Sequence, residues 1–206
     1  MNDSLSINTK YIVNWFNAIR NLPDTERTRA LEAFWSGQID SKCWLVNTLN
    51  DYVCEESNIY IFGGWIGVLA SLLFKSAKYK VNHITNIDID PWCEKSSREI
   101  CNHVNNFDHV ISDMKDYFYD FDYYPNIVIN TSTEHVDQET YDLWFDRIPY
   151  DSLIVVQGNN FFDCTEHVRC SSSLLDFKRM NYTHNTLYEG VLPHDLYDRY
   201  MCIFKK

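Results

Sequence analysis

Short apolar runs alternate with helical segments along most of the chain from residue 58 onward. Strands are predicted at 59–62, 83–89, 109–112, 126–130 and 152–157, with helices between them at 65–75, 92–105 and 137–147. The runs 127–129 and 153–156 are apolar on both faces, which is typical of strands buried between two layers of helices. Helical crossovers between such strands indicate a parallel sheet.

The last part of the chain has a different pattern. A helix is predicted around 174–180, followed by strands at 186–191 and 197–204 that form an antiparallel hairpin with a wide loop. The whole pattern predicts an α/β fold with a doubly wound, mostly parallel seven-stranded sheet that ends in this antiparallel hairpin.

Before residue 58 the pattern is helical only. Apolar residues recur at three- and four-residue spacing in the first helix, at Tyr11, Ile12, Trp15, Phe16 and Ile19. A second helix is expected from about residue 26 until Gly37 stops it, and a third from near Ser41. These helices cannot bury their apolar stripes alone. We therefore expect residues 1–57 to form a helical extension packed on a main domain of residues 58–206.

Charge and apolar run length narrow the range of partners. The 206 residues carry a net charge of −11, and an acidic surface repels the phosphate backbone of nucleic acid, so a small-molecule or protein substrate is expected instead. The longest apolar stretch, 65–74, is about half the length of a membrane span, so no membrane association is expected. The first residues lack the basic and apolar regions of a signal peptide, which predicts a cytoplasmic location. The pattern leaves the oligomeric state open.

Three of the six glycines lie where the first predicted strand ends, in Gly63-Gly64-Trp65-Ile66-Gly67. A strand that breaks into glycines and restarts as a helix lets backbone amides approach a ligand at the helix N-terminus. The segment has neither the G-x-G-x-x-G spacing nor the lysine of a phosphate-binding loop. A glycine turn by itself also fits a plain connection between a strand and a helix.

Acidic residues end the next two predicted strands. Asp88 ends the second strand, where a carboxylate accepts hydrogen bonds from both hydroxyls of a ribose, and Asp90 is expected to cap the helix that follows. Asp113 and Met114 follow the third strand, where an acceptor beside an apolar side chain suits an adenine ring. An ordinary loop position for Asp113 fits the pattern equally well.

Together these residues resemble the class I S-adenosylmethionine-dependent methyltransferase family over about residues 58–206. The glycine turn matches the first motif of the family, Asp88-Ile89-Asp90-Pro91 the second, and Asp113-Met114 the third. The resemblance implies methyl transfer as the activity and S-adenosyl-L-methionine as the cofactor. It implies a cofactor site formed by Gly63, Gly64, Trp65, Gly67, Asp88, Ile89, Asp113, Met114 and Asn130.

Two positions depart from the family pattern. Ile61 stands where the family has an acidic residue two places before the first glycine, and Trp65 replaces the middle glycine. Backbone carbonyls of Phe62 or Gly63, or a residue of the N-terminal helices, would then take over the contact of the missing carboxylate. The Trp65 amide serves as a glycine amide would only if its φ is negative.

Six consecutive polar residues, 130–135, follow the fully apolar fourth strand, at the position that faces the transferred methyl group in this family. They form either a capping loop for the helix at 137–147 or a catalytic site in which Glu134 or His135 is a general base or a substrate ligand. Asn159, Asn160 and His167 follow the fifth strand and are expected to bind substrate in the same cleft.

The cysteines do not predict a metal site. Cys164, His167 and Cys170 offer three ligands without a second pair at matching spacing, so no metal is expected. The seven cysteines are expected to be free thiols in a reducing compartment.

Two other functions stay open beside methyl transfer. One is an enzyme that keeps the same cofactor but transfers or cleaves another of its groups. The other is a non-catalytic cofactor-binding domain whose acidic surface engages a protein partner.

Overall fold

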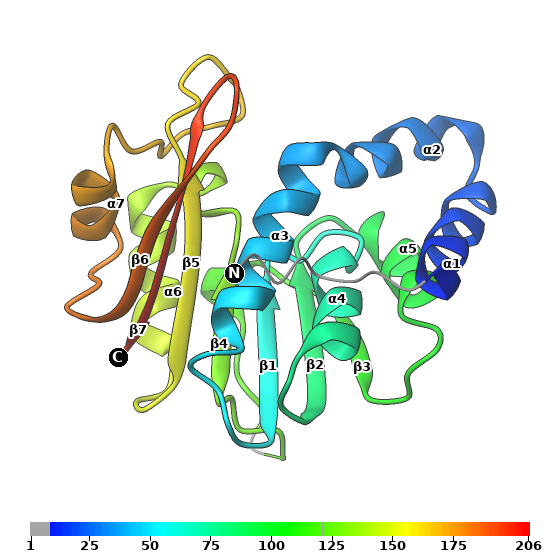
Figure 1. Ribbon diagram of the computed structural model, residues 1–206, viewed down its shortest axis with the longest axis horizontal. Coiled ribbons are helices and arrows are strands. Elements are labelled where there is room, and N and C mark those ends of the chain that lie inside the picture. The colour runs from blue at the N-terminus through cyan, green and yellow to red at the C-terminus, as the bar shows by residue number, and fades with distance from the viewer. Residues whose placement is uncertain (1–8, 121) are drawn as a thin grey trace.

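The computed structural model describes residues 9–120 and 122–206, and the first eight residues of the predicted extension lie outside the described residues (Figure 1). The helices are α1 (Thr9–Arg20), α2 (Asp24–Leu31), α3 (Ser36–Leu49), α4 (Val68–Ser76), α5 (Cys93–Ile100), α6 (Gln138–Arg147) and α7 (Leu174–Met180). The strands are β1 (Ser57–Phe62), β2 (Val81–Asp88), β3 (Phe107–Ile111), β4 (Ile127–Asn130), β5 (Leu153–Asn159), β6 (Asn185–Pro193) and β7 (Asp198–Lys205). Within this part of the chain, none of the helices combines the length and the apolar character that crossing a bilayer requires.

The seven strands form one sheet in the order β3-β2-β1-β4-β5-β7-β6. The first five strands in this order are parallel, whereas β7 is antiparallel to both β5 and β6. Phe62, the last residue of β1, is aligned with Ile87 of β2 and Asn130 of β4, so the carboxyl ends of the central strands lie at one edge. The predicted doubly wound sheet with an antiparallel terminal hairpin is confirmed.

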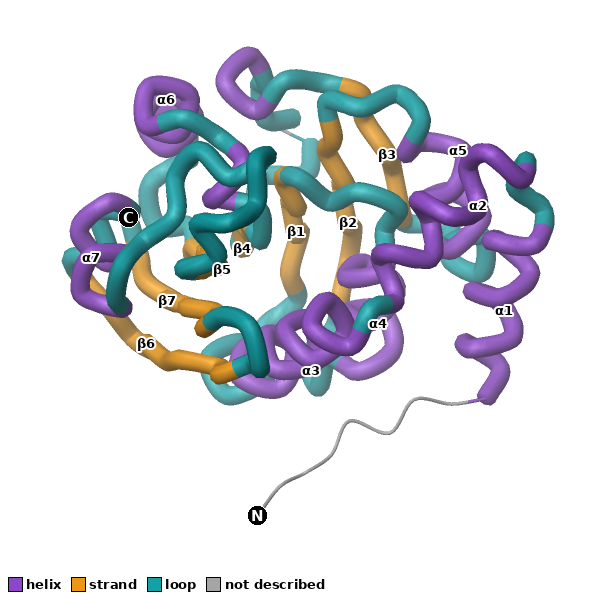
Figure 2. The backbone as a smooth tube through the Cα atoms, turned by 90° about the horizontal axis from the view of Figure 1, so that it is seen from above, coloured by secondary structure: helices purple, strands orange, loops and turns teal. Residues whose placement is uncertain are grey.

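Side-chain alternation along β1 divides the interior into two cores. Ile59 and Ile61 pack on one face with residues of α1, α3 and α4, while Tyr60 and Phe62 pack on the other face with Trp144 of α6. Figure 2 shows the sheet from above, with α3 and α4 on one side and α6 on the other. Because both faces are covered, the central strands need apolar residues at every position, and polar residues concentrate at the strand ends.

The N-terminal helices share the core of the α4 face. The indole Nε1 of Trp15 donates a hydrogen bond of 3.0 Å to Ser71 Oγ on α4. The buried side chain of Gln157 on β5 donates through Nε2 to the carbonyl of Ser41 on α3, also at 3.0 Å. These two buried hydrogen bonds fix α1 and α3 to the sheet with specific geometry, in addition to apolar contact.

Three predicted helix limits are wrong for local reasons. The helix predicted from 65 begins at Val68, because Gly67 has a φ of +79° and cannot be part of a right-handed helix. The helix predicted to run to 105 ends at Ile100, and Asn106 beyond it donates hydrogen bonds to carbonyls of β2. Gly37 does not stop the second helix. It lies in the first turn of α3, where a Cβ would approach the Tyr197 hydroxyl to 2.8 Å.

A buried histidine makes the stability of this fold depend on pH. His109 on β3 is buried, with Nδ1 at 2.7 Å from Ser97 Oγ and 3.1 Å from Asn86 Nδ2. Burial lowers the pKa of His109 below its ordinary value, although the charges of Asp88 and Glu94 act in the opposite direction. The unfolded chain therefore takes up the proton first as the pH falls.

We predict that this histidine lowers the free energy of unfolding as the pH falls below about 6.5, the ordinary histidine pKa. Each pH unit over which only the unfolded chain is protonated costs about 1.4 kcal/mol. Urea unfolding at pH 7.5 and 5.5 should show a smaller difference between the two pH values for His109→Gln than for the wild type. An unchanged difference in the variant would show that His109 is not the responsible group.

Candidate functional site

A cavity of about 1030 Å³ opens at the carboxyl edge of the sheet. Its wall is formed by the ends of β1, β2, β4 and β5, by the loop after β5 and by residues of the N-terminal helices such as Glu32, Gln38 and Lys42. The predicted site residues that line it are Gly63, Gly64, Trp65, Asp88, Ile89, Asp113, Met114, Asn130, Glu134, His135, Asn159 and His167. Gly67 and Asn160 do not line it. Gly67 forms the turn into α4, and Asn160 is hydrogen-bonded to Asp198 through both its side chain and its backbone.

The glycine turn after β1 has left-handed backbone at three of its five residues. Gly63, Trp65 and Gly67 have φ values of +61°, +48° and +79°. Gly64 has no room for a side chain, because a Cβ there would lie 2.0 Å from Asn86 Oδ1. A positive φ is common for glycine but unusual for a bulky residue, so Trp65 holds a strained conformation at the edge of the cavity.

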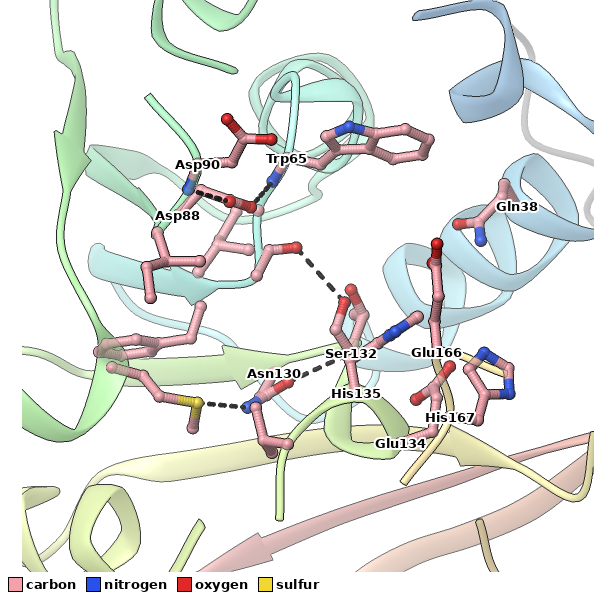
Figure 3. Close-up of a pocket in the computed structure, with 18 of the residues that line it drawn as sticks. Gln38, Trp65, Asp88, Asp90, Asn130, Ser132, Glu134, His135, Glu166 and His167 are labelled. Carbon is pink, nitrogen blue, oxygen red and sulfur yellow. Dashed lines mark hydrogen bonds between the residues drawn. The ribbon is translucent and has the colours of Figure 1, made fainter. Parts of the chain in front are cut away.

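The strained Trp65 backbone has a defined partner. Its amide donates a hydrogen bond of 2.8 Å to Asp88 Oδ2, as Figure 3 shows. The condition of a negative φ at Trp65 is therefore not met, and the amide binds the Asp88 carboxylate instead of pointing at a ligand. The second oxygen, Oδ1, accepts a hydrogen bond from the Asp90 amide at 3.0 Å. Each carboxylate oxygen keeps a lone pair for a ligand hydroxyl, because each accepts only one of these bonds.

Asp90 has the local role expected of it. Its Oδ1 accepts a hydrogen bond from the Trp92 amide at 3.0 Å, just before α5. Its Oδ2 pairs with Arg29 of α2 at 2.6 Å, and the Arg29 guanidinium lies 4.6 Å from the ring centre of Trp92. Burial tends to raise the pKa of Asp90, but the bonds from Trp92 and Arg29 prevail and hold it below its ordinary value. This group attaches α2 to the rim of the cavity.

The third motif combines a cap with an apolar contact. Asp113 caps a short 3₁₀ turn, Met114–Asp116, by accepting a hydrogen bond from the Lys115 amide, and it also pairs with Lys115 Nζ at 3.1 Å. The sulfur of Met114 lies 3.9 Å from Nδ2 of the buried Asn130. Asp113 thus has the ordinary loop role while it lines the cavity.

The polar segment after β4 contains a buried ion pair. Glu134 and Arg199 are 2% and 4% exposed, and Arg199 Nη1 donates to Glu134 Oε1 at 2.6 Å. Asn159 Nδ2 donates to the same oxygen at 2.7 Å, and Arg199 Nη2 donates to the carbonyl of Thr131. The backbone carbonyl of Glu134 accepts from two amides of the loop after β5. This segment is therefore more than a capping loop, although Asp137 does cap α6 by accepting from the Thr140 amide.

Two histidines lie beside the buried carboxylate. The rings of His135 and His167 have centres 4.7 Å apart in an edge-to-face arrangement, and Figure 3 shows them next to Glu134. His135 is exposed at the cavity, yet desolvation of its ring by the surrounding wall lowers its pKa, with Glu134 opposing this effect and His167 adding to it. At neutral pH His135 therefore has a neutral ring that can accept a proton.

A lysine on α3 has an unusual environment in the same wall. Lys42 is buried, and its Nζ donates to Gln38 Oε1 at 2.6 Å and to the Gln38 carbonyl at 3.3 Å. Burial, together with the positive charge of Arg199, lowers the pKa of Lys42 to about 7. Lys42 can therefore give or take a proton near neutral pH.

The sequence interpretation missed Arg199 and Arg29 as site residues. Arg199 stands in an otherwise apolar stretch of β7, Tyr200–Phe204, and a charged residue beside a buried strand is the only signal that could have found it. Arg29 gave no signal, because a basic residue on an exposed helix is usually solvated.

No protein-family model matches the sequence, and no curated protein sequence matches it. Solved structures do match. The chain is similar to the N-methyltransferase NodS from Bradyrhizobium japonicum WM9 in complex with S-adenosyl-L-homocysteine, with a TM-score of 0.69 and 10% identity over 94% of this chain and 98% of that one. It is also similar to magnesium protoporphyrin IX methyltransferase (ChlM) from Synechocystis PCC 6803, with a TM-score of 0.61 and 10% identity over 95% and 94% of the two chains. The chain has the class I methyltransferase fold.

The buried pair gives a stability prediction. Arg199→Met leaves the Glu134 carboxylate buried without its counter-charge, which typically costs about 3–5 kcal/mol in the free energy of unfolding. Adding Glu134→Gln to Arg199→Met should recover part of this loss, because the uncompensated charge is removed. Lys80→Met, which breaks the exposed pair with Glu56, is the matched control and should change stability little. Chemical denaturation measures all four proteins, and equal losses in Arg199→Met and the control would contradict the prediction.

Proposed function

We propose that the protein is an S-adenosylmethionine-dependent methyltransferase that acts on a small-molecule or protein acceptor. The observation that carries this proposal is the Asp88 carboxylate, held by the Trp65 and Asp90 amides at the glycine turn and facing the cavity. Proteins of the same fold support it, since NodS and ChlM are N- or porphyrin methyltransferases by title and both structures contain S-adenosyl-L-homocysteine.

The residues at the β1–β2 end fit the nucleoside part of this cofactor. The lone pairs left on Asp88 are suited to the two ribose hydroxyls. Ile89 is 65% exposed and lines the cavity, as does Met114, and both offer apolar surface to an adenine ring. An exposed isoleucine beside a carboxylate is the arrangement that a flat ring attached to a sugar would cover.

The amino-acid part of the cofactor needs other partners than in the family pattern. Ile61 is fully buried and offers no charge where the family has an acid. Glu32 and Gln38 of the N-terminal helices line the cavity instead, so we assign the contact to the cofactor ammonium to these residues. This assignment explains why the helical extension forms part of the wall.

When bound, the cofactor supplies an electrophilic methyl group, and the chain's residues position the acceptor and handle its proton. Holding the two reactants in line is the main contribution expected of the protein. The neutral ring of His135 is suited to accept a proton from the acceptor, and Lys42 is a second group that can do so near neutral pH.

The net charge of −11 and the cavity volume of about 1030 Å³ support a small-molecule or protein acceptor over duplex nucleic acid. A single ligand pocket usually measures about 300–1000 Å³, so this one has room for the cofactor and a small acceptor or side chain together.

A second candidate function is the transfer of a different group from the same cofactor. Its support is the similarity to MtNAS, whose structures include complexes with S-adenosylmethionine and with MTA and tNA. The MtNAS complex with S-adenosylmethionine has a TM-score of 0.58 and 12% identity, over 95% of this chain and 71% of that one. The absence of the family's acid at Ile61 fits this alternative as well.

Calorimetric titration with S-adenosylmethionine tests the binding. Wild-type protein should bind one equivalent, and Asp88→Asn should bind about ten- to a hundredfold more weakly, because hydrogen bonds to a charged group contribute about 1.5–3 kcal/mol. Asp51→Asn, the same change at an exposed residue outside the cavity lining, should bind as the wild type does. No heat with wild-type protein, and no thermal shift, would exclude both enzymatic functions.

Product analysis separates the two candidate reactions once binding is established. Mass spectrometry after incubation with candidate acceptors should detect S-adenosyl-L-homocysteine if a methyl group is transferred. Methylthioadenosine in its place would identify the second candidate. Binding without any product would support a non-catalytic domain.

A further inference from the structure

We propose that Glu134, His135 and His167 form a binding site for one divalent transition-metal ion at the β4–β5 end of the cavity. Each residue offers one ligand atom, and the three atoms lie within 4.8 Å of one another. Metal–nitrogen and metal–oxygen bonds of about 2.0–2.2 Å place two ligands of one ion up to about 4 Å apart. Small rotations of the exposed His135 ring would close the remaining distance.

An unpartnered buried oxygen points to a missing ligand at this place. Glu134 is almost completely buried, and its Oε1 accepts hydrogen bonds from both Arg199 and Asn159. Its Oε2 is buried without any hydrogen-bond partner among the described residues. A carboxylate oxygen in this situation carries a desolvation cost that a bound cation would remove.

The two histidines are prepared for coordination in different ways. Nδ1 of His167 lies 2.9 Å from the carbonyl of Phe161, and a hydrogen bond to a carbonyl places the proton on Nδ1. Nε2 then carries the lone pair, which is the usual arrangement of a metal-binding histidine with an outer-shell carbonyl. His135 keeps a neutral ring at neutral pH, because desolvation lowers its pKa.

The outer shell is also built from the neighbouring strand. The amide of Phe161 donates to Asn159 Oδ1 at 2.9 Å, while Asn159 Nδ2 holds Glu134. Asn159 thus positions both the carboxylate and the carbonyl that orients His167. Such second-shell contacts usually matter about 10- to 100-fold for metal affinity.

The donor set selects the class of ion. Two imidazoles and one carboxylate suit Zn²⁺, Fe²⁺, Co²⁺ or Mn²⁺ better than Mg²⁺ or Ca²⁺, which prefer oxygen ligands. Cys170 is not expected to contribute a thiolate, because burial raises the pKa of its thiol to about 11. Arg199 opposes a cation electrostatically, but it already engages Oε1, and Glu166 in the cavity wall supplies another negative charge.

Three protein ligands leave coordination positions open, and all three residues line the cavity. If the site is combined with the proposed methyl transfer, on which this step rests, the open positions take an oxygen or nitrogen atom of the acceptor. The acceptor class would then be a molecule that chelates or ligates a divalent ion.

Titration of the cofactor-free protein with Co²⁺ tests the site. The visible spectrum should report one equivalent of bound Co²⁺ without the charge-transfer band of a thiolate ligand. His135→Ala and His167→Ala should each weaken binding at least about tenfold, comparable to a second-shell loss or larger. His184→Ala, at an exposed histidine outside the cavity lining, should bind as the wild type does.

The outcomes separate this proposal from the proposed function. No Co²⁺ binding to wild-type protein, equal binding in the His135 and His167 variants, or a thiolate band would each overturn the metal site. Asp88→Asn should keep full Co²⁺ affinity, while wild-type protein in EDTA should still bind S-adenosylmethionine. Circular dichroism of both histidine variants shows that they are folded, and loss of the free Mn²⁺ resonance signal upon binding gives a second readout that thiols hardly affect.

Discussion

The buried pair of Glu134 and Arg199 is the interaction on which the polar half of the site depends. It joins the loop after β4 to β7, the one strand that runs against its neighbours. A charge pair at this depth contributes little net stability, but each partner is costly without the other. The pair therefore determines the conformation of the 130–135 segment more than it stabilises the fold as a whole. Because the antiparallel strand supplies the arginine, the terminal hairpin is part of the site.

The two ends of the cavity have different chemistry. At the β1–β2 end, backbone amides, one carboxylate and apolar side chains surround a space suited to a sugar and a flat ring. At the β4–β5 end, a carboxylate, two histidines and a lysine lie together, with pKa values of His135 and Lys42 shifted towards or below neutrality. Perturbed titratable groups that gather in a cleft are typical of a site where protons or ions are handled. Binding and reactivity are thus assigned to separate strands of the same edge.

Sequence pattern was sufficient for the sheet and insufficient for the polar contacts. Runs that are apolar on both faces, such as 127–129, can be explained only by strands between helix layers, so the fold could be predicted. The positive φ of Trp65 could not, because it results from the bond between its amide and an aspartate 23 residues away. Arg199 was missed for a similar reason, since its partner lies 65 residues earlier and only the sheet order brings them together. His135 and His167 were each identified, but their edge-to-face contact depends on two loops that no spacing rule connects.

The hydrogen bond from Gln157 to the Ser41 carbonyl gives the N-terminal helices a permanent place in the architecture. Its donor is fully buried in the middle of β5, so a chain without α3 would leave an amide group of the sheet interior facing solvent or an empty space. The extension also contributes Glu32, Gln38 and Lys42 to the cavity wall. Evolution of a new acceptor preference could therefore proceed through substitutions on α3 alone, while the strands that carry the cofactor motifs stay as they are.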